Sequence, residues 1–119
     1  MDKIFLTELK VDTVIGIWDW ERRIRQTVII DIEMSADIAK AAATDDVADT
    51  LNYKSVAKRV QAFVAESSFQ LVETLAERIA AIIRDEFDVE WVSVRVNKPG
   101  AIRGSKAVGV LIERGEWRD

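Results

Sequence analysis

Apolar and polar residues alternate along two stretches near the start of the chain, and such alternation is typical of strands with one buried face. The first stretch is KIFLTELKVDTV, residues 3–14, and the second is TVIIDIEMSADI, residues 27–38. In the second stretch every other position is apolar and predicts the buried face: Val28, Ile30, Ile32 and Met34. Ile29 is an apolar exception on the opposite face. The short loop between the stretches, which follows Gly16, predicts an antiparallel hairpin.

Two amphipathic helices are predicted in the middle of the chain. Residues 53–66 carry an apolar stripe at helical spacing, formed by Val56, Val60, Phe63 and Val64. Residues 70–86 carry a second stripe, formed by Val72, Leu75, Ile79, Ile82 and Ile83. Asn52 is positioned to cap the first helix, and Ser67 or Ser68 to cap the second. The acidic segment before the first helix, ATDDVADTLN, lacks helical periodicity, so we predict no helix there.

Alternation returns in the last third of the chain. VSVRVN, residues 92–97, favours a third strand, and KAVGVLIER, residues 106–114, favours a fourth. The order strand, strand, helix, helix, strand, strand predicts an α+β fold in one domain over residues 1–119, with both helices on one face of a four-stranded antiparallel sheet. The other face and both sheet edges stay uncovered. Because bare edges pair readily, we expect self-association into a closed ring of sheets.

Tryptophan is frequent for so short a chain. Two of its four tryptophans stand in the loop motif WDW, where they fit a role in a subunit interface. Local packing is the alternative, and it is the interpretation we prefer for Trp91, which lies on a strand.

Composition excludes several kinds of site. The chain has no histidine and no cysteine, which removes Ser-His-Asp and Cys-His nucleophiles, disulfides and the usual zinc sites. Acid–base chemistry must then come from Lys, Tyr, Asp, Glu, a hydroxyl or water. A carboxylate-bound magnesium stays open, but no dense acidic motif such as an EF-hand loop is present. We therefore expect neither a metal nor a cofactor.

Charge and hydropathy restrict the partners. The net charge of −4, from 17 basic and 21 acidic residues, disfavours a nucleic-acid partner. A local cluster of Arg22, Arg23 and Arg25 is either a small-anion site or, more commonly for such clusters, a solvated loop. No apolar run approaches the ~20 residues of a membrane span, and MDKIFLTEL does not have the character of a signal peptide. We expect no membrane partner and a cytoplasmic location.

Lys98 is the first candidate for chemistry because it stands at the end of the third strand, directly before Pro99 and Gly100. A residue before proline is held extended, proline fixes its own φ, and glycine lets the chain turn. A lysine on such a rigid support suits proton transfer. The alternative is an ordinary surface turn.

Three other polar residues are candidates, each with a plainer alternative. Glu73 lies in the first turn of the second helix, where it either interacts with the helix dipole or accepts two parallel N–H bonds from a flat heterocycle. Tyr53, the only tyrosine, opens the first helix as a surface aromatic or as a stacking platform and proton donor. Glu21, in WDWERR, is either a loop charge paired with an arginine or part of the site.

Six stretches, taken together and in order, resemble the dihydroneopterin aldolase family. They are IFLTELKVDTVIGIWDWER, DIEMSAD, DDVADTLNY, FQLVETLAERIA, VNKPGAI and VGVLIER, and they span essentially the whole chain. The resemblance implies the tunnelling fold, in which such subunits assemble into tetrameric β-barrels that stack as octamers. It also implies retro-aldol cleavage of dihydroneopterin to 6-hydroxymethyl-dihydropterin and glycolaldehyde. No metal and no lysine Schiff base is needed in that family, because the ring imine of the pterin accepts the electrons.

The resemblance also implies residue roles. Glu73 matches the pterin anchor and Lys98 the general acid/base. Tyr53 matches a tyrosine that the neighbouring subunit supplies, which helps proton transfer at the substrate side chain and packs on the pterin. Glu21 matches the acidic residue near the lysine and the hydroxylated tail of the substrate. The backbone at 51–52, Leu51 and Asn52, would add pterin contacts. One departure is AIRGSK after the Lys-Pro-Gly motif, where many members have a second proline.

The cations near that departure, Arg103 and Lys106, together with Arg22 and Arg23, leave a phosphorylated substrate open. Two rival functions remain. A dihydroneopterin triphosphate epimerase shares the fold, but such relatives generally lack the intact Lys-Pro-Gly that stands here. A non-catalytic ring-forming protein that binds a pterin or purine would have no need of the lysine.

Overall fold

The computed structural model describes residues 1–119, and four strands form one antiparallel sheet in the order β1-β2-β3-β4. The strands are β1 (Asp2–Thr13), β2 (Gln26–Ala36), β3 (Trp91–Pro99) and β4 (Ala107–Gly115). The predicted hairpin and the antiparallel four-stranded sheet are confirmed. Strands that follow one another in the chain are also neighbours in the sheet, and β1 and β4 form its two edges.

Alternation in β2 and β3 produces the buried face of the sheet, as predicted. The apolar positions of the two strands stand opposite one another: Ile30 pairs with Val96, Ile32 with Val94 and Met34 with Val92. All of these side chains are fully buried, and Val28 joins them. β4 contributes less, because Val110 and Ile112 are half-buried and Val108 is exposed.

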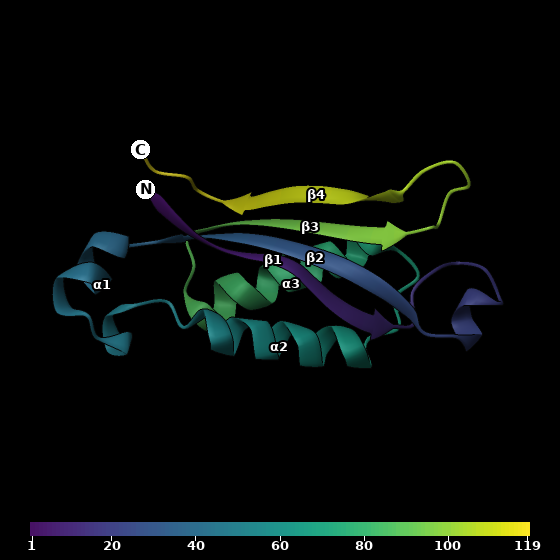
Figure 1. Ribbon diagram of the computed structural model, residues 1–119, viewed down its shortest axis with the longest axis horizontal. Helices are drawn as coiled ribbons and strands as arrows, with labels where there is room; N and C mark the ends of the chain where they lie inside the picture. The colour runs from purple at the N-terminus through teal and green to yellow at the C-terminus, as the bar shows by residue number, and fades with distance from the viewer.

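Two long helices, α2 (Tyr53–Glu66) and α3 (Val72–Phe87), cover this face side by side (Figure 1). Their apolar stripes close the core, with these side chains fully buried: Val56, Val60, Val64, Leu75, Ile79 and Ile83. Ile82, Val72 and Phe63 are half-buried at its margin. The predicted layer of two helices on one face of the sheet is thus confirmed.

Helix ends agree with prediction at one position and not at another. The side chain of Asn52 caps α2 by accepting a hydrogen bond from Ser55 N–H at 3.1 Å. The predicted serine cap of α3 is wrong, because α3 follows Leu71 with no side-chain cap. Ser67 instead ends α2, and its hydroxyl donates to Val64 O at 2.8 Å.

The segment between β2 and α2 is also a correction. The strand ends at Ala36, and a short helix, α1 (Ile38–Thr44), occupies residues expected to be strand or loop. A 3-10 turn, η2 (Val47–Asp49), follows. The carboxylates of Asp37 and Asp46 start these turns by accepting from backbone N–H groups. Neither turn buries a residue, so no apolar periodicity marked them in the sequence.

The helix-free face of the sheet carries an aromatic cluster at the end where the termini lie. Trp91 is 7 % exposed, and its ring meets Trp117 edge-on with 4.9 Å between centroids. Lys3 Nζ lies 5.0 Å from the Trp91 ring centroid. Local packing of Trp91 is therefore confirmed. Trp18 and Trp20 remain exposed in the loop between β1 and β2.

None of the helices has both the length and the apolar character of a membrane-spanning segment.

Candidate active site

The loop between β1 and β2, residues 14–25, buries a carboxylate. It contains a 3-10 turn, η1 (Glu21–Arg23), and Glu21 is only 4 % exposed. Gly16 makes room for this side chain: a Cβ built at Gly16 would lie 2.2 Å from Glu21 Cδ. The φ of +129° at Gly16 is also a conformation that side chains other than glycine rarely adopt. The glycine therefore decides where the Glu21 carboxylate lies.

Lys98 meets this carboxylate from the sheet. Its position on β3 is fixed by pairing with Val108 of β4, and Gly100 turns the chain after Pro99 with a φ of +69°. The Lys98 Nζ donates to Glu21 Oε2, and the lysine side chain is 14 % exposed. The turn that holds Lys98 thus carries a nearly buried ion pair. Glu21 pairs with a lysine, not with the arginine that the plainer alternative predicted.

Two further donors hold the Glu21 carboxylate. Trp18 N–H donates to Oε1 at 3.3 Å, and Gln26 Nε2 donates to Oε2 at 3.2 Å. Burial by itself would raise the pKa of Glu21, but hydrogen bonds from Lys98, Gln26 and the Trp18 backbone together outweigh burial and lower the pKa below its ordinary value. The site therefore keeps an ionised carboxylate in contact with an ammonium group.

Gln26 is a site residue that the sequence interpretation missed. Its side chain also donates to Ile15 O at 2.9 Å, so one amide group bridges the loop backbone and the carboxylate. A glutamine at the first position of a strand has no distinctive spacing. Only the folded loop brings it to Glu21.

The arginine cluster in the same loop serves the fold. Arg22 donates to the carbonyl oxygens of Gly16 and Phe69, at 2.9 and 3.0 Å, and to that of Ser68. Arg25 donates to backbone carbonyls at 2.8 and 2.9 Å. Their guanidinium groups are thus used within the chain and do not support the small-anion interpretation. Arg23 is exposed and makes no side-chain hydrogen bond or ion pair.

Glu73 lies in the first turn of α3, as predicted, and is exposed. Its side chain has no partner among the hydrogen bonds and ion pairs of the chain. The alanines one and two turns further along, Ala76 and Ala80, are buried in the core. The link before α3 contacts the loop of Glu21, because Gly16 N–H donates to Phe69 O at 3.3 Å. Glu73 thus belongs to the same end of the molecule as Glu21 and Lys98.

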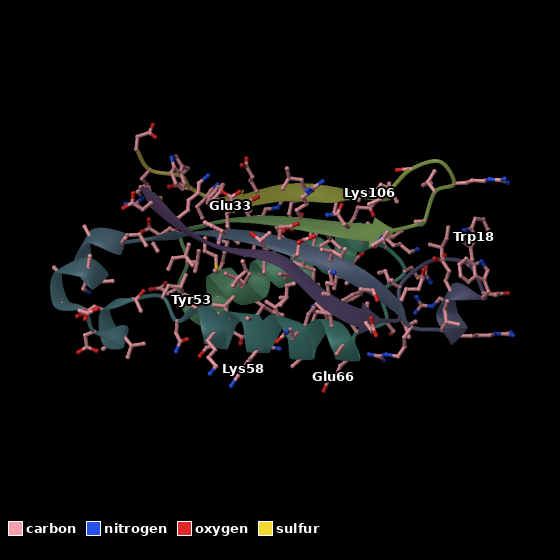
Figure 2. All side chains as sticks on the ribbon, in the orientation of Figure 1. Trp18, Glu33, Tyr53, Lys58, Glu66 and Lys106 are labelled. Carbon is pink, nitrogen blue, oxygen red and sulfur yellow. The ribbon has the colours of Figure 1, made fainter.

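The remaining candidates, Leu51, Asn52 and Tyr53, lie at the other end. Figure 2 shows Tyr53 at the start of α2, well separated along the long axis from Trp18 in the loop of Glu21. Leu51 and Glu90, the residue before β3, both line a hollow of about 890 Å³ near the two termini. β3 spans 9 residues, so at ~3.3 Å per residue its two ends are on the order of 25 Å apart. One chain therefore holds the candidate residues in two separate groups.

The hollow does not mark the Lys98 site. It surrounds residues near the termini and includes none of Glu21, Glu73 and Lys98. The nearly buried Glu21–Lys98 ion pair marks the candidate site, since an acid–base pair removed from solvent is the feature with chemical consequence. Tyr53 itself is 56 % exposed, so its ring is free to contact another molecule.

Three comparisons agree on the relatives of this chain. The family model described as dihydroneopterin aldolase matches residues 4–113. The dihydroneopterin aldolase of Escherichia coli strain K12 is 45% identical over 115 residues, which cover 97% of this chain and 94% of that protein. The crystal structure of the E. coli enzyme in complex with neopterin has a TM-score of 0.94 and 45% identity, covering 97% of this chain and 100% of that one. The dihydroneopterin triphosphate 2'-epimerase of Pseudomonas aeruginosa is more distant, 29% identical over 94% of this chain and 91% of that protein.

Proposed function

Since the chain belongs to the dihydroneopterin aldolase family, we infer that it cleaves 7,8-dihydroneopterin by a retro-aldol reaction to 6-hydroxymethyl-7,8-dihydropterin and glycolaldehyde. The observation that carries the assignment of residues is the nearly buried Glu21–Lys98 pair, held by Gln26 and Trp18 N–H. A proton donor fixed beside a carboxylate is what a proton-transfer reaction needs.

The substrate chemistry places the protons. A base takes the proton of the side-chain 2'-hydroxyl, the C1'–C2' bond breaks, and glycolaldehyde leaves. The two electrons of that bond move into the ring imine, whose nitrogen takes up a proton. A proton then returns to C1' while the ring nitrogen loses one, and the product carries a hydroxymethyl group. We assign the proton delivered towards the ring nitrogen to Lys98, through water, with Glu21 beside the hydroxylated tail.

We propose that catalysis proceeds by proton transfer without a Schiff base or a metal. Lys98 Nζ is engaged as a donor to Glu21, so its nitrogen is arranged to give a proton rather than to attack a carbonyl. The proposed reaction also needs no metal, because it consists of proton transfers and its electron acceptor lies within the substrate. The pterin ring imine then serves as the electron acceptor.

Substrate binding falls to Glu73 in this proposal. An exposed carboxylate without an internal partner is free to accept two parallel N–H bonds from the 2-amino group and ring N–H of a pterin. Its place in the first turn of α3 keeps it at the Glu21–Lys98 end. The backbone of Leu51 and Asn52 adds further pterin contacts. Tyr53 packs on the pterin and assists proton transfer at the substrate side chain.

Leu51, Asn52 and Tyr53 lie at the end of the molecule where β3 begins, on the order of 25 Å from Lys98 near the other end of that strand. The complete site therefore forms between two subunits. The bare edges of β1 and β4 support such an assembly, since edge-to-edge pairing would close several sheets into a β-barrel. We propose a tetrameric ring of tunnelling-fold subunits, or two rings stacked as an octamer. Each active site then takes Glu21, Glu73 and Lys98 from one subunit and Tyr53 from its neighbour.

One assay tests the reaction. The protein is incubated with 7,8-dihydroneopterin, and both glycolaldehyde and the hydroxymethyl pterin are measured. Formation of the two products in equal amounts is expected. Binding without turnover would leave a pterin-binding protein, and an epimer without glycolaldehyde would point to the epimerase, the more distantly related function.

A second experiment tests the shared site. Tyr53→Ala and Lys98→Ala proteins, each inactive alone, are dissociated, mixed in equal amounts and reassembled. Random assortment places an intact Tyr53 against an intact Lys98 at about a quarter of the interfaces, so about that fraction of wild-type activity returns. No recovered activity in rings shown by mass spectrometry to be mixed would place both residues in one subunit's site.

A further inference from the structure

Four residues form a compact hydrogen-bonded cluster where the β1–β2 loop meets the link between α2 and α3. We call it the Gly16 junction: Gly16, Arg22, Ser68 and Phe69. Gly16 N–H donates to Phe69 O at 3.3 Å. The guanidinium group of Arg22 donates to Gly16 O at 2.9 Å, to Phe69 O at 3.0 Å and to Ser68 O. One side chain thus binds backbone oxygens of both segments at once.

The junction stands between the two parts of the site that one subunit supplies. On one side, Gly16 packs against the carboxyl group of Glu21, which directly precedes Arg22 in the chain. On the other side, Phe69 belongs to the short link that leads into α3 and its first-turn residue Glu73. Any change in the junction therefore alters how Glu73 is placed relative to Glu21 and its partner Lys98.

We propose that Arg22 is a positioning residue of the site, which fixes the spacing between the pterin anchor Glu73 and the Glu21–Lys98 pair. The role of Glu73 as the anchor rests on the proposed function. A planar guanidinium group with several N–H donors in fixed directions is suited to hold several carbonyl oxygens together. Proton transfer to a bound pterin depends on this spacing, whereas binding through Glu73 alone does not.

The chain offers two matched controls for this proposal. Arg25 is also tied to backbone oxygens, of Asp12 and Ala65, but these lie on the end of β1 and the last turn of α2 and not beside Glu73. Arg25→Ala therefore removes a comparable set of bonds without touching the junction. Arg23, next to Arg22, is exposed and makes no such contact, so Arg23→Ala removes only a charge from the same turn.

The test measures kcat, the dissociation constant of the pterin product by fluorescence, and hydrogen exchange of the Gly16 amide in the assembled protein. A misplacement of about 1 Å in a catalytic geometry costs on the order of 10²-fold in rate. We expect Arg22→Ala to lower kcat by roughly 10- to 100-fold and to change product affinity by less than about 3-fold. Gly16 amide exchange should accelerate in Arg22→Ala and stay slow in Arg25→Ala.

Arg22→Lys, a milder variant, covers the case in which Arg22→Ala does not fold. A lysine keeps the charge but presents a single nitrogen to the three oxygens, so kcat should again fall while product affinity holds. One outcome would overturn the proposal. In it, the folded Arg22 variants lose as much stability as Arg25→Ala, but their kcat equals that of Arg25→Ala and Arg23→Ala. Wild-type protein that binds a pterin but does not cleave dihydroneopterin would sink the proposed function instead, while the Gly16 exchange result still decides whether Arg22 holds the junction.

Discussion

Replacing Gly16 with alanine should disable the site at its tightest contact. The added Cβ would lie 2.2 Å from Glu21 Cδ and 2.4 Å from each carboxylate oxygen, distances that real side chains essentially never show. The neighbouring atom is not the free end of a flexible chain, because Trp18 N–H, Gln26 and Lys98 hold that carboxylate. Glu21 must therefore leave its position, and the ion pair with Lys98 breaks.

The cost in stability of Gly16→Ala has two parts, backbone strain and the loss of the ion pair. A non-glycine residue at a φ of +129° carries backbone strain of about 1–3 kcal/mol. Separating a fully buried ion pair costs ~3–5 kcal/mol, and the 14 % exposure of the Lys98 side chain brings the figure towards the lower end, since the ammonium group can turn to water. Urea unfolding should therefore show a loss of roughly 3 kcal/mol or more. Activity should fall by at least about 10²-fold, the usual contribution of a positioned acid–base group.

Gly104 provides the control for backbone strain. It also has a positive φ, +88°, but a Cβ built there meets nothing within 4 Å. Gly104→Ala should lose about 1 kcal/mol and keep turnover near that of the wild type. Equal cleavage rates in Gly16→Ala and Gly104→Ala, measured on folded protein with 7,8-dihydroneopterin, would refute the view that Gly16 places the catalytic carboxylate.

Three further predictions concern the polar groups of the site. Lys98→Ala should lower kcat by about 10²–10⁴-fold while pterin affinity, measured by fluorescence, stays nearly unchanged; near-normal turnover would contradict its role. Glu73→Ala should instead weaken pterin binding strongly, because two N–H groups lose a charged acceptor, and unchanged product affinity would exclude the anchor role. The lowered pKa of Glu21 means that its stabilising contribution is present above the ordinary glutamate pKa and is lost as pH falls through the lowered value. Gln26→Leu removes one of the lowering hydrogen bonds, so the pKa of Glu21 should rise and the acidic limb of the pH–rate profile should move to higher pH; an unmoved limb would count against this coupling.

Local patterns in the amino-acid sequence predicted most of the fold. Alternation in β2 and β3 and the stripes of α2 and α3 are local patterns, and each reports which side of one element is buried. Met34, Val92 and Leu75, for example, lie in the core where their spacing placed them. The same patterns predicted the order of elements, the four-stranded sheet and the bare edges. Residue identity at single positions, with the resemblance to the family, singled out Lys98 and Glu73.

Other features depend on contacts between distant parts of the chain or on polar caps, which local apolar patterns do not record. The short helix α1 begins at a side-chain cap from Asp37 and buries nothing, so hydrophobic spacing had no signal for it. The partner of Glu21 is 77 residues away in the chain, and only the register of β3 beside the folded loop brings Lys98 to it. Gln26 and Arg22 act through hydrogen bonds to a carboxylate and to backbone oxygens that no periodicity encodes. Lys98 lies near the end of β3, whereas Tyr53 lies at the end of the molecule where β3 begins. The extended strand keeps these two ends apart, so one subunit does not bring the two residues together.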